Sequence, residues 1–121
     1  MPPISKSNVH EETAMRGYEI TFFTHEDCFH GSTQMSDWLM LSALNLGLRG
    51  ATIVTGSEGY GHNRHVHSAR LFEPSDNPQE IVMIVSKEEA DHLFDHLQEE
   101  DVHLFYVKKS VEFGMLGKPD Q

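Results

Sequence analysis

Hydrophobic and polar positions in the first half of the chain change from a two-residue period to a helical one. Residues 18–23 alternate and carry aromatic side chains, a pattern typical of a strand. After a polar loop, Ser32 or Thr33 is the expected N-cap of a helix that runs to about Leu46. Its broad apolar face indicates packing against a core, and Gly47 favours its end.

The second half of the chain repeats this change of period. A strand is predicted over Ala51–Gly59, and another begins at 69–72, pauses at a turn-rich insert at 73–78 and resumes at 80–85. Ser86 with Glu89 forms a capping box. The helix that it opens has apolar residues at the i, i+3, i+4, i+7 spacing, namely Ala90, Leu93, Phe94 and Leu97. A last strand is predicted over 102–111.

The order β-α-β-β-α-β predicts the α+β class, with a ferredoxin-like antiparallel sheet that carries both helices on one face. The other face needs cover, which a trimer or another oligomer would supply. Residues 1–16 are expected to be a disordered lead, residues 17–113 the single domain, and residues 114–121 a tail.

The segment from Gly56 to Arg70 concentrates more chemistry than any other. It holds three glycines, three histidines and two arginines in fifteen residues. Glycine allows close backbone approach to a ligand, and arginine offers a planar donor fork for phosphate or carboxylate. The spacing fits neither a Walker loop nor a dinucleotide fingerprint. A hairpin turn and a ligand-contacting loop therefore both remain open.

Histidines offer two candidate metal sites. His62, His65 and His67 could supply nitrogen ligands, although polar loop residues are the plainer interpretation. His92 and His96 also have a metal-ligand spacing, but they fall opposite the apolar helix face, so we expect a solvated surface there.

Composition narrows the function classes. The net charge of −10 argues against general nucleic-acid binding but leaves room for a small anion where the few cations converge. Cys28 is the only cysteine, so no intrachain disulfide forms, and the cytoplasm is the expected compartment. No apolar run approaches the length of a membrane span or a secretion signal. We find no nucleophile–base constellation and expect no enzyme.

The glycine-rich segment and its flanks resemble the small PII-like proteins that are catalogued as a domain of unknown function. The resemblance covers about residues 18–111. It rests on Gly-Leu-Arg-Gly-Ala-Thr-Ile-Val at 47–54, Gly-Ser-Glu-Gly-Tyr-Gly at 56–61 and His-Ser-Ala-Arg at 67–70. Weaker matches are the apolar run at 81–85 with Lys-Glu-Glu at 87–89, and Glu26-Asp27.

This resemblance implies a ferredoxin-like subunit in a PII-type homotrimer that is related to the copper-tolerance trimers. It implies that residues 60–67 correspond to the T-loop, and that an adenine nucleotide binds in the cleft between subunits. Binding would switch residues 57–68, which would then engage or release a transporter or an enzyme. Because residues 99–103 are acidic where the family's phosphate-gripping loop would lie, AMP, ADP or another small anion is as tenable as ATP.

We therefore predict a cytoplasmic PII-like signalling protein that requires no cofactor and binds a nucleotide. The expected ligand-binding residues are Arg49, Gly56, Gly59, Tyr60, Gly61, Arg64, His67, Arg70 and Lys108. One alternative is a metal-binding trimer of the copper-tolerance type, which would hold a divalent metal on His62, His65 and His67. Another is an adaptor trimer that recognises its protein partner without a ligand.

Overall fold

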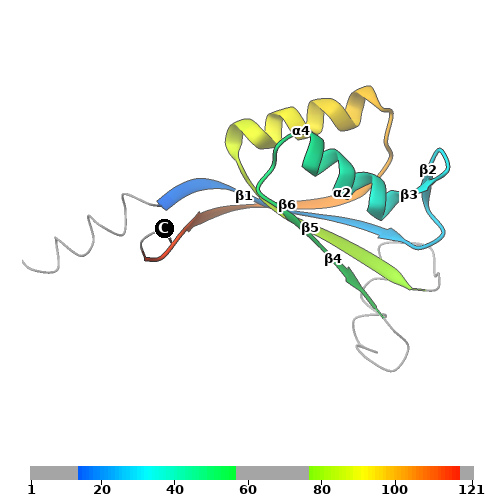
Figure 1. The fold of residues 1–121 in the computed structure, drawn as a ribbon, viewed down its shortest axis with the longest axis horizontal. Helices are drawn as coiled ribbons and strands as arrows, with labels where there is room; N and C mark the ends of the chain where they lie inside the picture. Colours follow the sequence, from blue (N-terminus) through cyan, green and yellow to red (C-terminus); the bar gives the residue numbers. More distant parts are fainter. Residues whose placement is uncertain (1–13, 57–76, 118–121) are drawn as a thin grey trace, which may run out of the picture.

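The computed structural model describes residues 14–56 and 77–117, which form one antiparallel sheet covered on one face by two helices (Figure 1). The sheet consists of β1 (Ala14–His25), β4 (Ala51–Thr55), β5 (Pro78–Ser86) and β6 (Phe105–Gly114) in the order β4-β5-β1-β6. Helices α2 (Met35–Asn45) and α4 (Lys87–Glu99) supply the crossovers. The predicted ferredoxin-like α+β class is confirmed.

The core lies between the sheet and the helices. Along β5 buried and half-buried residues alternate, because successive side chains of a strand point to opposite faces. The buried apolar residues are Ile20, Phe22, Met35, Leu39, Ala43, Ile81, Met83, Val85, Ala90, Leu93 and Leu97. The sheet's other face, here called the open face, carries half-buried Val82 and Ile84 beside exposed Phe105 and Val107.

The start of α2 differs from the prediction. The N-cap is Gln34, which makes no side-chain cap, in place of Ser32 or Thr33. A two-strand hairpin, β2 (Phe29–His30) with β3 (Thr33–Gln34), uses those residues in its turn and second strand. The Met35 N–H donates instead to the Cys28 carbonyl at 2.8 Å, so a backbone acceptor replaces the expected hydroxyl.

Both helices end in the same backbone motif. At α2 the Leu48 N–H donates to the Ala43 carbonyl at 2.9 Å around Gly47, whose φ is +74°. At α4 the Val102 N–H donates to the Leu97 carbonyl at 3.1 Å around Asp101, whose φ is +58°. These are Schellman-type ends, which satisfy the last carbonyls of a helix.

The start of α4 agrees with the prediction, whereas the limits of β1 and β6 differ from it. The predicted capping box is present: the Glu89 N–H donates to Ser86 Oγ at 3.1 Å, and the Ser86 N–H donates to Glu89 Oε1 at 2.8 Å. Strand β6 begins at Phe105, later than predicted, because the helix-ending motif occupies the residues through Val102. Strands β1 and β6 pair as far as Ala14 with Gly114, beyond the predicted domain limits.

Of the glycine-histidine segment at residues 56–70, the structure describes Gly56. The described residues do not include the predicted strand segments 57–59 and 69–72 or the insert up to residue 76. The Gly56 N–H donates to the Pro78 carbonyl at 2.9 Å and closes the ladder between β4 and β5. Within the described part of the chain, neither helix has the length and hydropathy needed to cross a bilayer.

Candidate functional site

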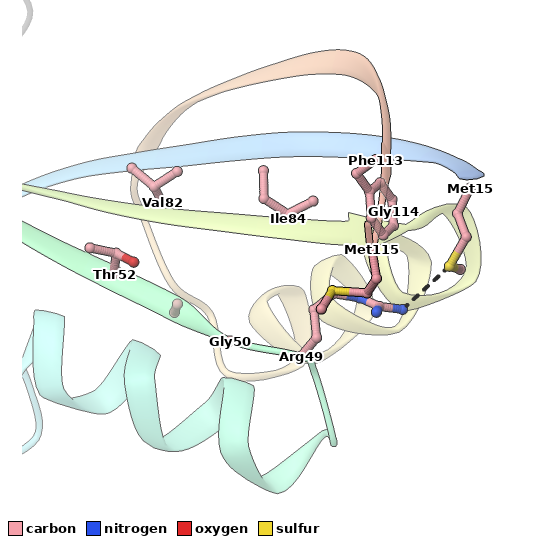
Figure 2. Close-up of a pocket in the computed structure, with 10 residues that line it drawn as sticks. Met15, Arg49, Gly50, Thr52, Val82, Ile84, Phe113, Gly114 and Met115 are labelled. Atoms are coloured by element: carbon pink, nitrogen blue, oxygen red, sulfur yellow. Dashed lines mark hydrogen bonds between the residues drawn. The ribbon is translucent and has the colours of Figure 1, made fainter. Parts of the chain in front are cut away.

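A cavity of about 470 Å³ lies at the end of the sheet where β1 begins and β6 ends (Figure 2). We call it the Arg49 cavity. The turn between α2 and β4 positions Arg49 there, because Gly47 ends the helix and β4 starts two residues after Arg49. The main walls are the side chains of Met15, Thr52, Val82, Ile84, Phe113 and Met115.

The Arg49 side chain is held by three contacts. Its guanidinium lies 5.0 Å from the centre of the Phe113 ring, and one terminal nitrogen donates to Met15 Sδ at 3.8 Å (Figure 2). Its Nε lies 4.0 Å from Glu89 Oε1. The side chain is 45% exposed, so solvent screens the ion pair and leaves it a small energy. The guanidinium is therefore placed at the cavity without being committed to a strong partner.

The chemistry of this cavity suits a small molecule with an apolar body and an anionic group. Apolar side chains supply most of the lining, and the size is within the usual range for ligand pockets. Arg49 adds one permanent positive charge with a fork of N–H donors. Exposed Thr52 contributes a hydroxyl that can donate or accept.

Of the predicted ligand-binding residues, the structure describes Arg49, Gly56 and Lys108, and it does not bring them together in one subunit. Gly56 follows β4 whereas Arg49 precedes it, which separates them by roughly 20 Å at the usual rise of a strand. The Lys108 Nζ lies 4.5 Å from the centre of the Tyr18 ring and 5.5 Å from that of Phe94. It thus occupies the helix-covered face, whereas the Arg49 cavity includes open-face residues.

The other predicted site residues fall in a part of the chain that the structure does not describe. They are Gly59, Tyr60, Gly61, His62, Arg64, His65, His67 and Arg70. The predicted metal ligands are all among them. Within residues 14–56 and 77–117, no group of three histidine, cysteine or carboxylate side chains is arranged to hold a metal ion.

The interpretation of His92 and His96 as one solvated surface is wrong for His96. Its Nε2 lies 3.2 Å from Ser42 Oγ, and its ring stacks on Trp38 with centroids 5.5 Å apart. The His30 ring also stacks on Trp38, with centroids 4.1 Å apart. The helical wheel of α4 separated apolar from polar residues correctly, but it could not show that α2 packs against the polar edge.

The histidine–tryptophan stack is structural in character. It joins β2, α2 and α4, and His30 Nε2 adds a contact of 3.4 Å to Glu100 Oε1. Although Ser42 and His96 resemble a nucleophile with its base, Ser42 is only 4% exposed. A hydroxyl so deeply buried is not presented to a substrate.

Comparison with known proteins identifies the family. Residues 17–112 match the family DUF190, described as an uncharacterized ACR. No curated protein matches the sequence at a significant level.

Solved structures share the fold. CPII from Thiomonas intermedia K12, in a complex with ADP, AMP and acetate, is 16% identical with a TM-score of 0.57 over 84% of this chain and 92% of that one. Its apo form, described as a nitrogen regulatory PII-like protein, is 16% identical with a TM-score of 0.52 over 84% and 96%. A protein from Thermus thermophilus that is described as a PII-like signaling protein is 19% identical. Its TM-score is 0.54 over 84% of this chain and 92% of that one.

At these identities the structural likeness concerns the fold, whereas the family match concerns the sequence and extends over most of the chain. The two agree with each other and with the architecture of the sheet and its helices. This chain therefore belongs to the DUF190 family and has a PII-like fold.

Proposed function

We propose that this chain is a PII-like regulatory protein of the cytoplasm that binds an adenine nucleotide at a cleft between the subunits of a homotrimer. It acts by binding and not as an enzyme. Occupancy of the cleft changes the conformation of residues 57–68, and these residues control a partner protein. The observation that carries the proposal is the Arg49 cavity, which offers a cation and an apolar wall in a PII-like fold.

The open face of the sheet supports the trimer. Phe105 is 44% exposed and Val107 39% exposed on this face, and both lie on β6, an outer strand of the sheet. Exposed apolar side chains that neighbour each other on an outer strand favour an interface between proteins. Covering it with neighbouring copies would place a second subunit beside the Arg49 cavity, because Val82 and Ile84 belong to both.

The separation of Arg49 from Gly56 supports a site shared between subunits. A phosphate group bound by Arg49 lies too far from Gly56 of the same subunit for both to contact it. Contacts from the glycine segment would then come from a neighbouring copy. A solved PII-like fold with ADP and AMP makes an adenine nucleotide the first ligand to test.

The switch rests on differential affinity. A nucleotide can shift residues 57–68 between two conformations only by the difference in its affinity for them. Hydrogen exchange of this segment, measured with and without nucleotide, reports that shift directly. Equal exchange in the two states would contradict the switch while leaving nucleotide binding intact.

The test of the site is calorimetric titration with AMP, ADP and ATP, with native mass spectrometry for the subunit number. We expect saturable binding to a trimer, weakened about tenfold by Arg49→Gln, because a charged hydrogen bond contributes roughly 1.5–3 kcal/mol. Lys87→Gln is the matched control, since Lys87 is an exposed cation at the start of α4 and does not line the cavity. Equal weakening in both variants, or no binding of any nucleotide, would remove the proposal.

A further inference from the structure

Two methionines line the Arg49 cavity, and solutes can reach both of their sulfurs. Met15 is 39% exposed and Met115 is 76% exposed. Met35 and Met83 belong to the core and are 5% and 0% exposed, so packing shields their sulfurs. An oxidant in solution therefore reaches the methionines of the cavity before those of the core.

Met15 contacts Arg49 through its sulfur. The Met15 Sδ accepts a hydrogen bond from a terminal nitrogen of Arg49 at 3.8 Å (Figure 2). Within the described residues, no hydrogen bond joins the Met115 sulfur to Arg49. A thioether sulfur is a weak acceptor with two lone pairs, so this contact leaves the sulfur able to react and leaves the guanidinium able to bind an anion.

Oxidation of Met15 changes this contact. A hydroperoxide transfers one oxygen atom to the sulfur, which loses two electrons. The O–O bond breaks, an S–O bond forms, and the proton of the hydroperoxide moves to the departing oxygen, which leaves as an alcohol or, from hydrogen peroxide, as water. The product is a polar sulfoxide. Because an Arg49 N–H already points at this sulfur, the new oxygen forms within reach of the guanidinium.

The oxidised side chain then competes with an anion for Arg49. A sulfoxide oxygen carries partial negative charge and accepts from a cation more strongly than a thioether does. The oxygen also makes one apolar wall of the cavity polar. Both effects lower the affinity of the Arg49 cavity for a molecule with an apolar body and an anionic group.

We propose that Met15 is a reversible oxidation site whose sulfoxide holds Arg49 and thereby lowers the affinity of the Arg49 cavity for its anionic ligand. Methionine sulfoxide reductases return the sulfoxide to methionine, so the modification acts as a switch. The effect on nucleotide affinity rests on the proposed function. The capture of Arg49 by the sulfoxide does not, since both side chains belong to this chain.

The test treats the full chain with hydrogen peroxide, locates the added oxygen by peptide mass spectrometry and measures ADP binding by calorimetry. We expect the two cavity methionines to be oxidised before Met35 and Met83. The ADP affinity should fall about tenfold and return after incubation with methionine sulfoxide reductases. A Met15 that stays reduced while Met115 is oxidised, or an unchanged affinity once Met15 is oxidised, would overturn the proposal.

Two variants locate the effect. Met15→Leu keeps an apolar side chain in the wall and cannot form a sulfoxide, so peroxide should leave its ADP affinity as it was before treatment. Met115→Leu is the matched control: it removes the more exposed methionine and keeps Met15, so peroxide should still weaken ADP about tenfold. An equal loss of affinity in treated Met15→Leu and treated wild-type protein would refute the role of Met15.

A measurement without nucleotide separates this proposal from the proposed function. The side-chain N–H signals of Arg49, assigned by their loss in Arg49→Gln, are recorded by NMR before and after peroxide treatment. We expect them to shift in the wild-type protein and to stay in place in Met15→Leu. If the reduced chain binds no nucleotide, the proposed function fails, and this shift still decides the proposal: its absence refutes the capture of Arg49.

Discussion

The two ends of the sheet differ in charge although β1 and β6 contribute to both. At one end the Arg49 cavity has mainly apolar walls and one guanidinium. At the other end a cavity of about 430 Å³, here called the Thr24 cavity, is lined by the Phe23 and Phe105 rings, and the neighbouring loop segments 26–27 and 99–101 are acidic. The strands supply the walls of both cavities, but the connections between elements supply the charge. Arg49 comes from the turn after α2, whereas the carboxylates come from the loops after β1 and α4.

In such a small fold, the connections between the elements set the charge at each end of the sheet. A sheet residue has to satisfy the core on one face, which restricts it to apolar or small polar types. A residue in a connection does not have to pack into the core, so it can carry a charge.

The Arg49 end depends on one close approach of backbones. A Cβ at Gly17 would lie 2.0 Å from the Val85 carbonyl oxygen, so Gly17→Ala must push β1 and β5 apart. We expect a loss of about 3 kcal/mol in the free energy of unfolding, measured by urea denaturation. Gly31→Ala is the control: it has open space but a φ of +65°, and it should cost about 1 kcal/mol. A smaller loss for Gly17→Ala than for Gly31→Ala would contradict this.

Charge reversal tests the Arg49 end. Arg49→Glu should weaken ADP binding roughly 100-fold, because it removes a guanidinium donor and adds a like charge. Arg49→Gln removes the same donor without adding a charge, so it should weaken ADP binding only about tenfold. Calorimetric titration of ADP into both variants measures the difference. Equal weakening by the two variants would show that the added carboxylate has no effect at the cavity.

The stack on Trp38 fastens the helices near the Thr24 end. His96→Ala removes a stacked ring and leaves the buried Ser42 hydroxyl without that partner, so the protein should lose about 1–2 kcal/mol of stability. His92→Ala, one turn away and exposed, should change stability by less than about 0.5 kcal/mol. Thermal unfolding of the two variants measures the difference, and equal melting temperatures would refute the role given to the stack.

The smallest effect has the opposite sign. Thr24→Val should raise the free energy of unfolding by about 1 kcal/mol, because valine fills the same space without an unpartnered hydroxyl. Thr21→Val should have almost no effect. Denaturation without ligand measures this gain. A loss of stability in Thr24→Val would mean that the hydroxyl is satisfied in the folded protein.

Local chemistry explains which parts of the fold the sequence predicted. The capping box at Ser86 and the helix end at Gly47 were found because each depends on residues only a few positions apart. Strand β5 was found because its alternation is set by one buried face. The N-cap of α2 was missed because the partner of the Met35 N–H is the Cys28 carbonyl, seven residues away across a hairpin.

The candidate sites show the same division. Arg49 was singled out from its residue type and its place beside the glycine segment, and the structure puts it in a cavity. The Thr24 cavity was not predicted, because its lining comes from the end of β1, the loop after it and the start of β6, which meet only in the folded chain.

The sequence by itself determined the order of the elements, the start of α4, the end of α2 and the acidic charge of the chain, because these depend on neighbouring residues or on sums over them. The tertiary structure alone decided that His96 stacks on Trp38, that Lys108 lies over aromatic rings, and that Arg49 and Thr24 lie at opposite ends of one sheet. These placements depend on which distant segments meet, and strand register and helix packing fix those meetings only in the folded chain.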